Sequence, residues 1–182
     1  MYPDVHTLAK ASTGDVLRIW KGMGYNRRAL YLKKIAQIVV ADYDGKFPDT
    51  EPELTKFPGL GTYTARAIMV FAFEKSVALV DTNIRQILTH FCFDGLPQKE
   101  ILIQDLAHEL VPQGKSWQWH QALMDYGALK LQRGAVKQLT AKKPSTPFKD
   151  SDRYIRGKVI DYLREGNIEE RVLIAGLMKK YG

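Results

Sequence analysis

The chain has 182 residues, of which 45% are hydrophobic and 26% are charged, the proportions of an ordinary globular protein. Lysine and arginine number 27 against 20 aspartate and glutamate residues, and the resulting formal charge of +7 favours an anionic partner. The single cysteine, Cys92, excludes an internal disulfide framework and an all-cysteine zinc or iron–sulfur site within one chain.

The N-terminal quarter reads as two helices. Helical periodicity dominates and strand-type alternation is nearly absent, which predicts an all-α fold. Ser12 or Thr13 caps a first short helix ending near Trp20, and the stretch KGMGYN breaks it. A long amphipathic helix is expected over about 27–43, where Gly45 stops it.

The rest of the chain continues the helical pattern. Pro48 and Thr50 introduce a short helix that stops before Pro58, and further helices are predicted over 62–73, 83–92, 99–110 and 116–130. A linker rich in lysine, proline and threonine, LTAKKPSTPFKD, separates them from two more helices, in SDRYIRGKVIDYLREG and NIEERVLIAGLMKKYG. We expect two helical lobes, over 1–80 and 81–140, and a linker with a C-terminal helical pair over 141–182.

The stretch PGLGTYTA has the features of a tight turn that binds phosphate. Pro58 ends the preceding helix, and Gly59 and Gly61 allow close backbone approach. Thr62 or its neighbour begins the next helix, whose first amides have no partner within the helix and can bind a phosphate. A plain helix–helix turn is the alternative, and a lone GxG does not decide between them.

Asp81 follows the buried apolar run SVALV and precedes Thr82 and Asn83. An aspartate at this place caps the next helix, NIRQILTHF. A capping aspartate can also face a cleft, so the two interpretations are compatible.

The combination FPGLGTYTARAI…ALVDTNIRQIL resembles the helix-hairpin-helix (HhH-GPD) DNA glycosylase superfamily. The segments LRIWKGMGYNRRALYLKKIA, GKFPDTEPELTKFPGLG and HQALMDYGALKL are similar to adenine glycosylases of the MutY type, and FKDSDRYIRGKVIDYLR is similar to a tail of some bacterial members. The resemblance covers most of the chain and implies the two-lobed helical fold of that superfamily, including its hairpin.

The resemblance also implies an activity, the excision of a base that is flipped out of DNA. It assigns to Asp81 the stabilisation of positive charge on the sugar. Bifunctional members have a lysine where this chain has Tyr63, and tyrosine cannot form an imine, so a monofunctional glycosylase is expected. Tyrosine occurs there in adenine and in thymine glycosylases of the superfamily, which leaves the excised base open.

The resemblance places the remaining site residues on DNA. Tyr25 matches an aromatic residue that wedges into the duplex, whereas the residues alone favour a buried tyrosine packed on the long helix. Arg27, Arg28, Lys33 and Lys34 line the DNA or simply solvate a helix face. The expected DNA-binding residues are Gly24, Tyr25, Gly59, Leu60, Gly61, Thr62, Thr64 and Asn83.

The chain departs from MutY-type proteins in three respects. The segment LKLQRGAVKQLTAKKPST has no cysteine where they hold an iron–sulfur cluster, and Leu131 stands at the first ligand position. A helix carrying a general-acid glutamate and glutamines, and a separate domain for 8-oxoguanine, are not recognisable. We therefore expect no iron–sulfur cluster and no metal site, with a monovalent cation at the hairpin as the one cofactor considered. Without that glutamate, adenine excision is expected to be weak until the helix is restored upstream.

The expected partner is double-stranded DNA with a mismatched or damaged base pair, bound by a monomer. The favoured reaction is removal of adenine opposite 8-oxoguanine or guanine. Removal of thymine or uracil opposite guanine, and a non-catalytic helix-hairpin-helix DNA-binding module, are the alternatives. No apolar run approaches a membrane span and no signal peptide is recognisable, so a cytoplasmic, nucleoid-associated protein without a membrane partner is expected.

Overall fold

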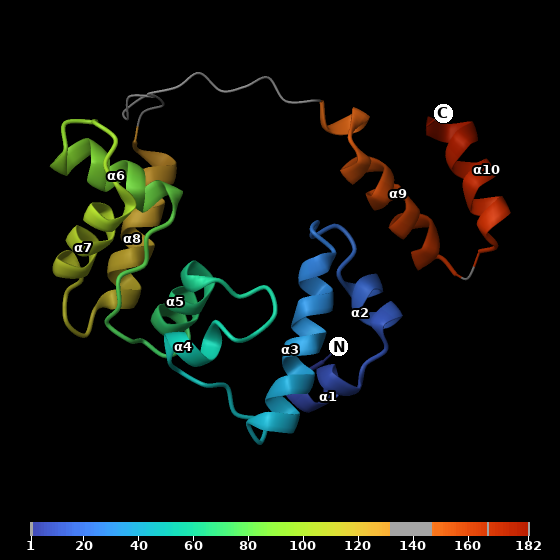
Figure 1. Ribbon diagram of the computed structural model, residues 1–182, viewed down its shortest axis with the longest axis horizontal. Coiled ribbons are helices and arrows are strands. Elements are labelled where there is room, and N and C mark those ends of the chain that lie inside the picture. The colour runs from blue at the N-terminus through green and yellow to red at the C-terminus, as the bar shows by residue number, and fades with distance from the viewer. Residues whose placement is uncertain (1, 132–146, 167, 182) are drawn as a thin grey trace. The chain divides into compact units, whose positions relative to one another are not determined.

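The computed structural model describes residues 2–131, 147–166 and 168–181, and over these ranges the structure consists of α-helices and one short 3-10 helix, without a strand (Figure 1). The all-α prediction is therefore confirmed for this part of the chain. Within the same ranges, no helix has the length and apolar character needed to cross a membrane.

The chain forms two compact units. One comprises residues 1–46 and 142–182, and the other comprises residues 47–141. The division expected from the sequence, at residue 80, differs from this one and falls inside the second unit. Packing of α5 (Thr62–Phe71) on α8 (Ser116–Leu129) joins residues that precede residue 80 to residues that follow it.

In the first unit, two short helices, α1 (Val5–Lys10) and α2 (Thr13–Ile19), pack on the long helix α3 (Arg27–Asp42) (Figure 1). The sequence pattern did not predict α1. The start of α1 is fixed by its N-cap, because the Asp4 carboxylate accepts a hydrogen bond of 2.8 Å from the Thr7 amide. The buried core of this unit consists of Val16, Ala29, Ile35, Ala36 and Val39.

The C-terminal helices also belong to the first unit. A 3-10 turn, η1 (Phe148–Asp150), precedes α9 (Asp152–Arg164), and α10 (Glu170–Tyr181) follows, so both helices lie where the sequence predicts them. Helix α9 packs on α2 and on α10. The C-terminal helices thereby return to the helices that precede the hairpin.

The second unit contains α4 (Glu51–Leu54), α5, α6 (Thr82–Cys92), α7 (Glu100–Leu110) and α8. A core cluster joins the extended segment before α6 to α6 and α7, and consists of Ala78, Val80, Ile84, Leu88, Ile103 and Ala107. Helices α6 and α8 approach so closely that a Cβ added at Gly127 would lie 2.7 Å from the Asn83 Cβ. This packing fixes the start of α6, where Asp81 stands.

Candidate active site

The predicted hairpin is a tight turn that opens directly onto α5. The Leu60 amide donates to the Phe57 carbonyl at 3.2 Å, and Gly59 has a φ of 79°, a conformation that favours glycine. Gly61 is the N-cap of α5 with an ordinary φ of −92°, and it provides no side-chain cap. The first turn, with Thr62 and Thr64 exposed, therefore presents its amides outward.

Among the residues that the structure describes, none requires glycine at position 61. A Cβ added there would meet no atom within 4 Å, and the backbone conformation is accessible to any residue. A glycine at the positive end of the helix instead leaves room for an anion to approach the first amides of α5.

Asp81 caps α6, as the sequence predicts. Its Oδ1 accepts from the Ile84 amide at 2.7 Å, and its Oδ2 accepts from the Asn83 side-chain amide at 3.3 Å. These bonds hold the carboxylate in one orientation. Asn83 therefore orients Asp81, and its expected contact with DNA stays a prediction.

A buried histidine fixes the segment that leads to Asp81. His120 on α8 is 1% exposed, and its Nε2 accepts from the Leu79 amide at 3.0 Å, while its Nδ1 lies 2.7 Å from the Ser116 carbonyl. The Nδ1 nitrogen therefore carries the proton. Burial lowers the pKa of His120, which the Ser116 carbonyl partly offsets, so the ring stays neutral.

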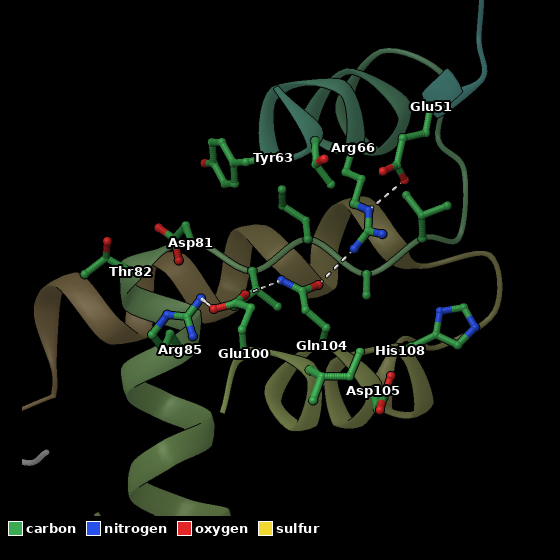
Figure 2. A pocket seen from close by; sticks show the side chains of 16 residues that line it. Glu51, Tyr63, Arg66, Asp81, Thr82, Arg85, Glu100, Gln104, Asp105 and His108 are labelled. Atoms are coloured by element: carbon green, nitrogen blue, oxygen red, sulfur yellow. Dashed lines mark hydrogen bonds and ion pairs between the residues drawn. The ribbon is translucent and has the colours of Figure 1, made fainter. Parts of the chain in front are cut away.

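Tyr63 and Asp81 line the same pocket, which has a volume of about 1080 Å³ and lies entirely within the second unit. Tyr63 projects from the first turn of α5, and Asp81 faces it from the start of α6 (Figure 2). Partial burial, and secondarily the Asp81 charge, raise the pKa of the Tyr63 hydroxyl. Tyr63 is therefore a protonated hydrogen-bond donor beside a carboxylate.

A chain of polar side chains that the sequence did not indicate lines the pocket (Figure 2). Arg66 contacts Glu51 at 2.8 Å and donates to Gln104 at 2.9 Å. Gln104 donates to Glu100 at 2.9 Å, and Glu100 pairs with Arg85 at 2.6 Å. The members come from α4, α5, α6 and α7, so no local pattern in the chain could reveal them.

Arginine side chains pair with both glutamates of this network. Glu51 is paired with Arg66. Hydrogen bonds from Arg85 and then from Gln104 lower the pKa of Glu100. Glu100 therefore holds no proton that it could give to a leaving group near neutral pH.

Tyr25 does not have the buried environment that the residues alone favoured. Its side chain is 71% exposed, and it follows Gly24 in the loop between α2 and α3. Tyr25 belongs to the first unit, whereas Tyr63, Asp81 and the hairpin belong to the second.

The sequence predicts no iron–sulfur cluster and no metal site, and a monovalent cation is considered at the hairpin. Residues 2–131, 147–166 and 168–181 contain no group of histidine, cysteine, aspartate or glutamate suited to a metal ion. Residues 132–146, most of the segment considered for an iron–sulfur cluster, lie outside the described residues. The hairpin offers backbone carbonyls, the ligands that suit a monovalent cation, and the cation stays a prediction.

Comparisons with characterised proteins identify relatives of the chain. The chain is 32% identical, over 184 aligned positions, to an adenine DNA glycosylase of Mycolicibacterium smegmatis, covering 90% of this chain and 62% of the relative. It is 31% identical, over 132 positions, to a thymine/uracil-DNA glycosylase of Methanothermobacter thermautotrophicus, covering 70% of this chain and 60% of that relative. The chain thus spans about three fifths of the length of these relatives.

Solved structures show the same fold. A thermostable thymine-DNA glycosylase superposes with a TM-score of 0.64 at 31% identity, over 70% of this chain and 61% of that one. Endonuclease III trapped on DNA superposes with a TM-score of 0.61 at 19% identity, over 86% and 72% of the two chains. The model of the HhH-GPD superfamily base excision DNA repair proteins matches residues 1–113, and the chain belongs to this superfamily.

Proposed function

We propose that the protein is a monofunctional DNA glycosylase, which hydrolyses the N-glycosidic bond of a base flipped out of a mismatched or damaged pair in double-stranded DNA. One observation carries this proposal. The Asp81 carboxylate is held in one orientation by the Ile84 amide, and it lines the same pocket as Tyr63 of α5, the helix that follows the hairpin. The protein acts as a monomer.

The reaction uses the fixed charge of Asp81. As the bond between the base and the C1′ carbon breaks, its electron pair leaves with the base and positive charge develops on the sugar. A carboxylate already oriented by the Ile84 and Asn83 amides stabilises that charge without reorganising. Water then adds to C1′, and its proton is released to solvent or to the base.

Tyr63, which lines the same pocket as Asp81, donates its hydroxyl proton to a hydrogen bond with the sugar in this proposal. The raised pKa keeps this donor protonated near neutral pH. A phenol forms no imine with C1′, so the abasic strand stays intact after the base has left.

The hairpin holds the backbone of the duplex. The first amides of α5 bind a phosphate, and the absence of a side chain at Gly61 allows this approach. Gly59, Leu60, Thr62 and Thr64 surround that contact, while Tyr25 and Gly24 contact the duplex separately, with the Tyr25 ring stacked between bases.

Adenine opposite 8-oxoguanine or guanine is the favoured substrate, because the relative aligned over 90% of this chain is an adenine DNA glycosylase. Adenine leaves poorly as an anion, and a general acid typically accelerates such a step by about 10²–10⁴-fold.

A second candidate is removal of thymine or uracil opposite guanine. The hydrogen bond from Arg85 lowers the pKa of Glu100, a glutamate of the pocket, so Glu100 is a poor proton donor, which favours a base that leaves without prior protonation. The similarity to a thymine/uracil-DNA glycosylase supports the same candidate.

Single-turnover excision distinguishes these functions. The protein, in excess, is incubated with duplexes containing adenine opposite 8-oxoguanine, adenine opposite guanine, thymine or uracil opposite guanine, or only matched pairs, and alkali then reveals abasic sites. We expect alkali-dependent cleavage of a mismatched duplex and none of the matched one. Gel-shift binding without excision of any base would instead identify a non-catalytic DNA-binding module.

A further inference from the structure

The loop between α2 and α3, residues 20–26, holds an aromatic ring in water on an unusual backbone. Gly22 and Gly24 have φ values of 87° and 67°, and Tyr25 has a φ of 49°. A tyrosine rarely adopts this left-handed conformation, and here its side chain is 71% exposed. Burial of the ring therefore does not explain the loop conformation, and other contacts must hold it.

One set of contacts comes from within the loop. The Trp20 indole nitrogen donates to the Gly24 carbonyl at 2.8 Å, and the Arg28 guanidinium lies over the Trp20 ring, 5.4 Å from its centroid. These contacts close the loop on itself, but they leave its far end at Asn26 to be fixed by another element.

Arg164, in the last turn of α9, supplies that contact. Its Nη2 donates to the Asn26 side-chain carbonyl at 2.8 Å, and its Nε donates to the Leu17 carbonyl at 3.0 Å. A third bond, from Nη1 to Asp161, is also 2.8 Å long. The Arg164 side chain is only 7% exposed, so the guanidinium is placed to join the two ends of the loop rather than to reach solvent.

The C-terminal end of α9 makes two further contacts, one with the loop and one with the end of α2. Lys21 forms an ion pair with Glu165 at 3.0 Å, and Arg18 donates to the Arg164 carbonyl at 3.3 Å. At the opposite end of α9, the Arg153 guanidinium lies 5.6 Å from the centroid of the Tyr25 ring. Helix α9 therefore lies along the loop from Arg164 to Arg153.

We propose that α9 holds the loop of residues 20–26 in the conformation that inserts Tyr25 into the duplex, and that Arg164 is the positioning residue for this insertion. The inference rests on the proposed function, in which Tyr25 stacks between bases. A ring that is already oriented loses less freedom on stacking than a mobile one, so Arg164 contributes to duplex unstacking without touching DNA.

The first measurement concerns the protein without DNA. In the full chain, Arg164→Met should increase hydrogen–deuterium exchange of residues 20–26, while Arg156→Met should not. Arg156 is the matched control, because it lies on the same helix, carries the same charge and donates within α9 to the Asp152 carbonyl. Equal exchange in the two variants would overturn the inference.

The second measurement follows the unstacking of bases in the duplex. The fluorescent base 2-aminopurine is placed beside the mismatch, in the duplex from which the parent excises a base. Parent protein should raise its fluorescence, and Tyr25→Ala should abolish the rise. Arg164→Met should reduce excision by about tenfold, as expected for partial loss of a stacking contact, and should reduce the rise in parallel. Arg156→Met should stay within about twofold of the parent, the effect of a single exposed charge.

A double-mutant cycle decides whether Arg164 acts through Tyr25. If it does, Arg164→Met has no further effect in the Tyr25→Ala background. An undiminished effect there overturns the inference. If Arg164→Met does not fold, Asn26→Ala replaces it, because it removes the loop end of the same bond and leaves α9 intact. A parent that neither binds nor unstacks any duplex overturns the proposed function, whereas an active parent with unaffected variants overturns only the role of α9.

Discussion

At the scale of single residues, the Asp81 carboxylate has a structural role, and the proposed function gives the same carboxylate a chemical role. Its Oδ1 caps α6 through the Ile84 amide, and the Asn83 amide holds its Oδ2. The helix cap therefore supplies the rigidity that electrostatic stabilisation of a charged sugar requires. Any test of the chemical role has to preserve the cap.

Gly61→Val should weaken binding to matched and mismatched duplexes equally, by about tenfold, the loss expected for a hydrogen bond to a charged group. The new side chain would enter open space among the described residues, at an ordinary φ, so the unfolding midpoint should fall only by the modest cost of a poorer N-cap residue. Gel-shift titration and thermal melting measure the two effects. A change in melting without a change in affinity would make Gly61 a purely structural residue.

The free energy of unfolding should fall as the pH is lowered below about 6.5, the ordinary pKa of histidine, through His120. Burial lowers the pKa of His120 in the folded protein, so the unfolded chain binds the proton first and acid favours unfolding. Urea titrations at pH 7.5 and 5.5 measure this loss. His120→Gln, which does not titrate, should show a smaller difference between the two pH values; an identical difference would exclude His120 as its source.

The sequence could identify some of these residues and not others. Asp81, Tyr63 and Gly61 stand in one continuous stretch, where a cap, a helix start and a turn are local features. The contacts of Arg66 with Gln104 and of His120 with Leu79 join residues distant in the chain, and only the packing of α5, α7 and α8 brings them together.

At the scale of elements, helix bounds were predictable because caps and apolar periodicity are local. The expected helix over 27–43 is observed as α3, Arg27–Asp42, and those over 83–92 and 99–110 agree equally well with α6 and α7. Helix α1 was missed because its six residues carry too few apolar positions to show a period, and only Asp4 and Thr7 indicate it.

Gly127→Ala should destabilise the protein by about 1–3 kcal/mol, the usual cost of overpacking a tight contact. The added methyl carbon would lie 2.7 Å from the Asn83 Cβ and would displace the start of α6. Since Asn83 orients Asp81, excision should fall more than duplex affinity. Chemical denaturation and single-turnover kinetics provide the two readouts.

Gly157→Ala is the control for that substitution. It lies within α9, where an added Cβ meets nothing within 4 Å, so it should stabilise the protein by about 0.5–1 kcal/mol through helix propensity alone. Equal destabilisation by both substitutions would mean that the contact between α6 and α8 is not the cause.

At the scale of the whole molecule, a charge of +7 together with outward-facing helix amides favours the proposed binding to a polyanion. Which residues share a unit could not be predicted from the sequence, because the return of α9 to α2 depends on contacts such as that of Arg164 with Leu17. The expected division at residue 80 followed the order of the chain and could not include this return.

Binding to a matched duplex should weaken steeply with salt, because phosphate contacts release counterions. We expect the logarithm of the affinity to fall against the logarithm of the salt concentration with a slope steeper than about −2, which corresponds to more than two phosphate contacts. Fluorescence anisotropy at several potassium chloride concentrations measures the slope. A flat response would exclude the DNA backbone as the main partner.

The purified protein should be colourless and should keep its fold in the presence of a chelator. One cysteine cannot supply the four thiolates of an iron–sulfur cluster. Visible absorption and assays of iron and sulfide test this expectation, and stoichiometric iron with sulfide would contradict it.

Single-turnover excision by Asp81→Asn tests the central claim most directly, on the duplex from which the parent removes a base fastest. Asparagine preserves the size and the helix cap but removes the negative charge, so duplex affinity and melting temperature should stay close to those of the parent. The excision rate should fall by at least about 10²–10³-fold, the usual effect of removing a group that stabilises transition-state charge. Excision at the parental rate by a correctly folded Asp81→Asn protein would contradict the account.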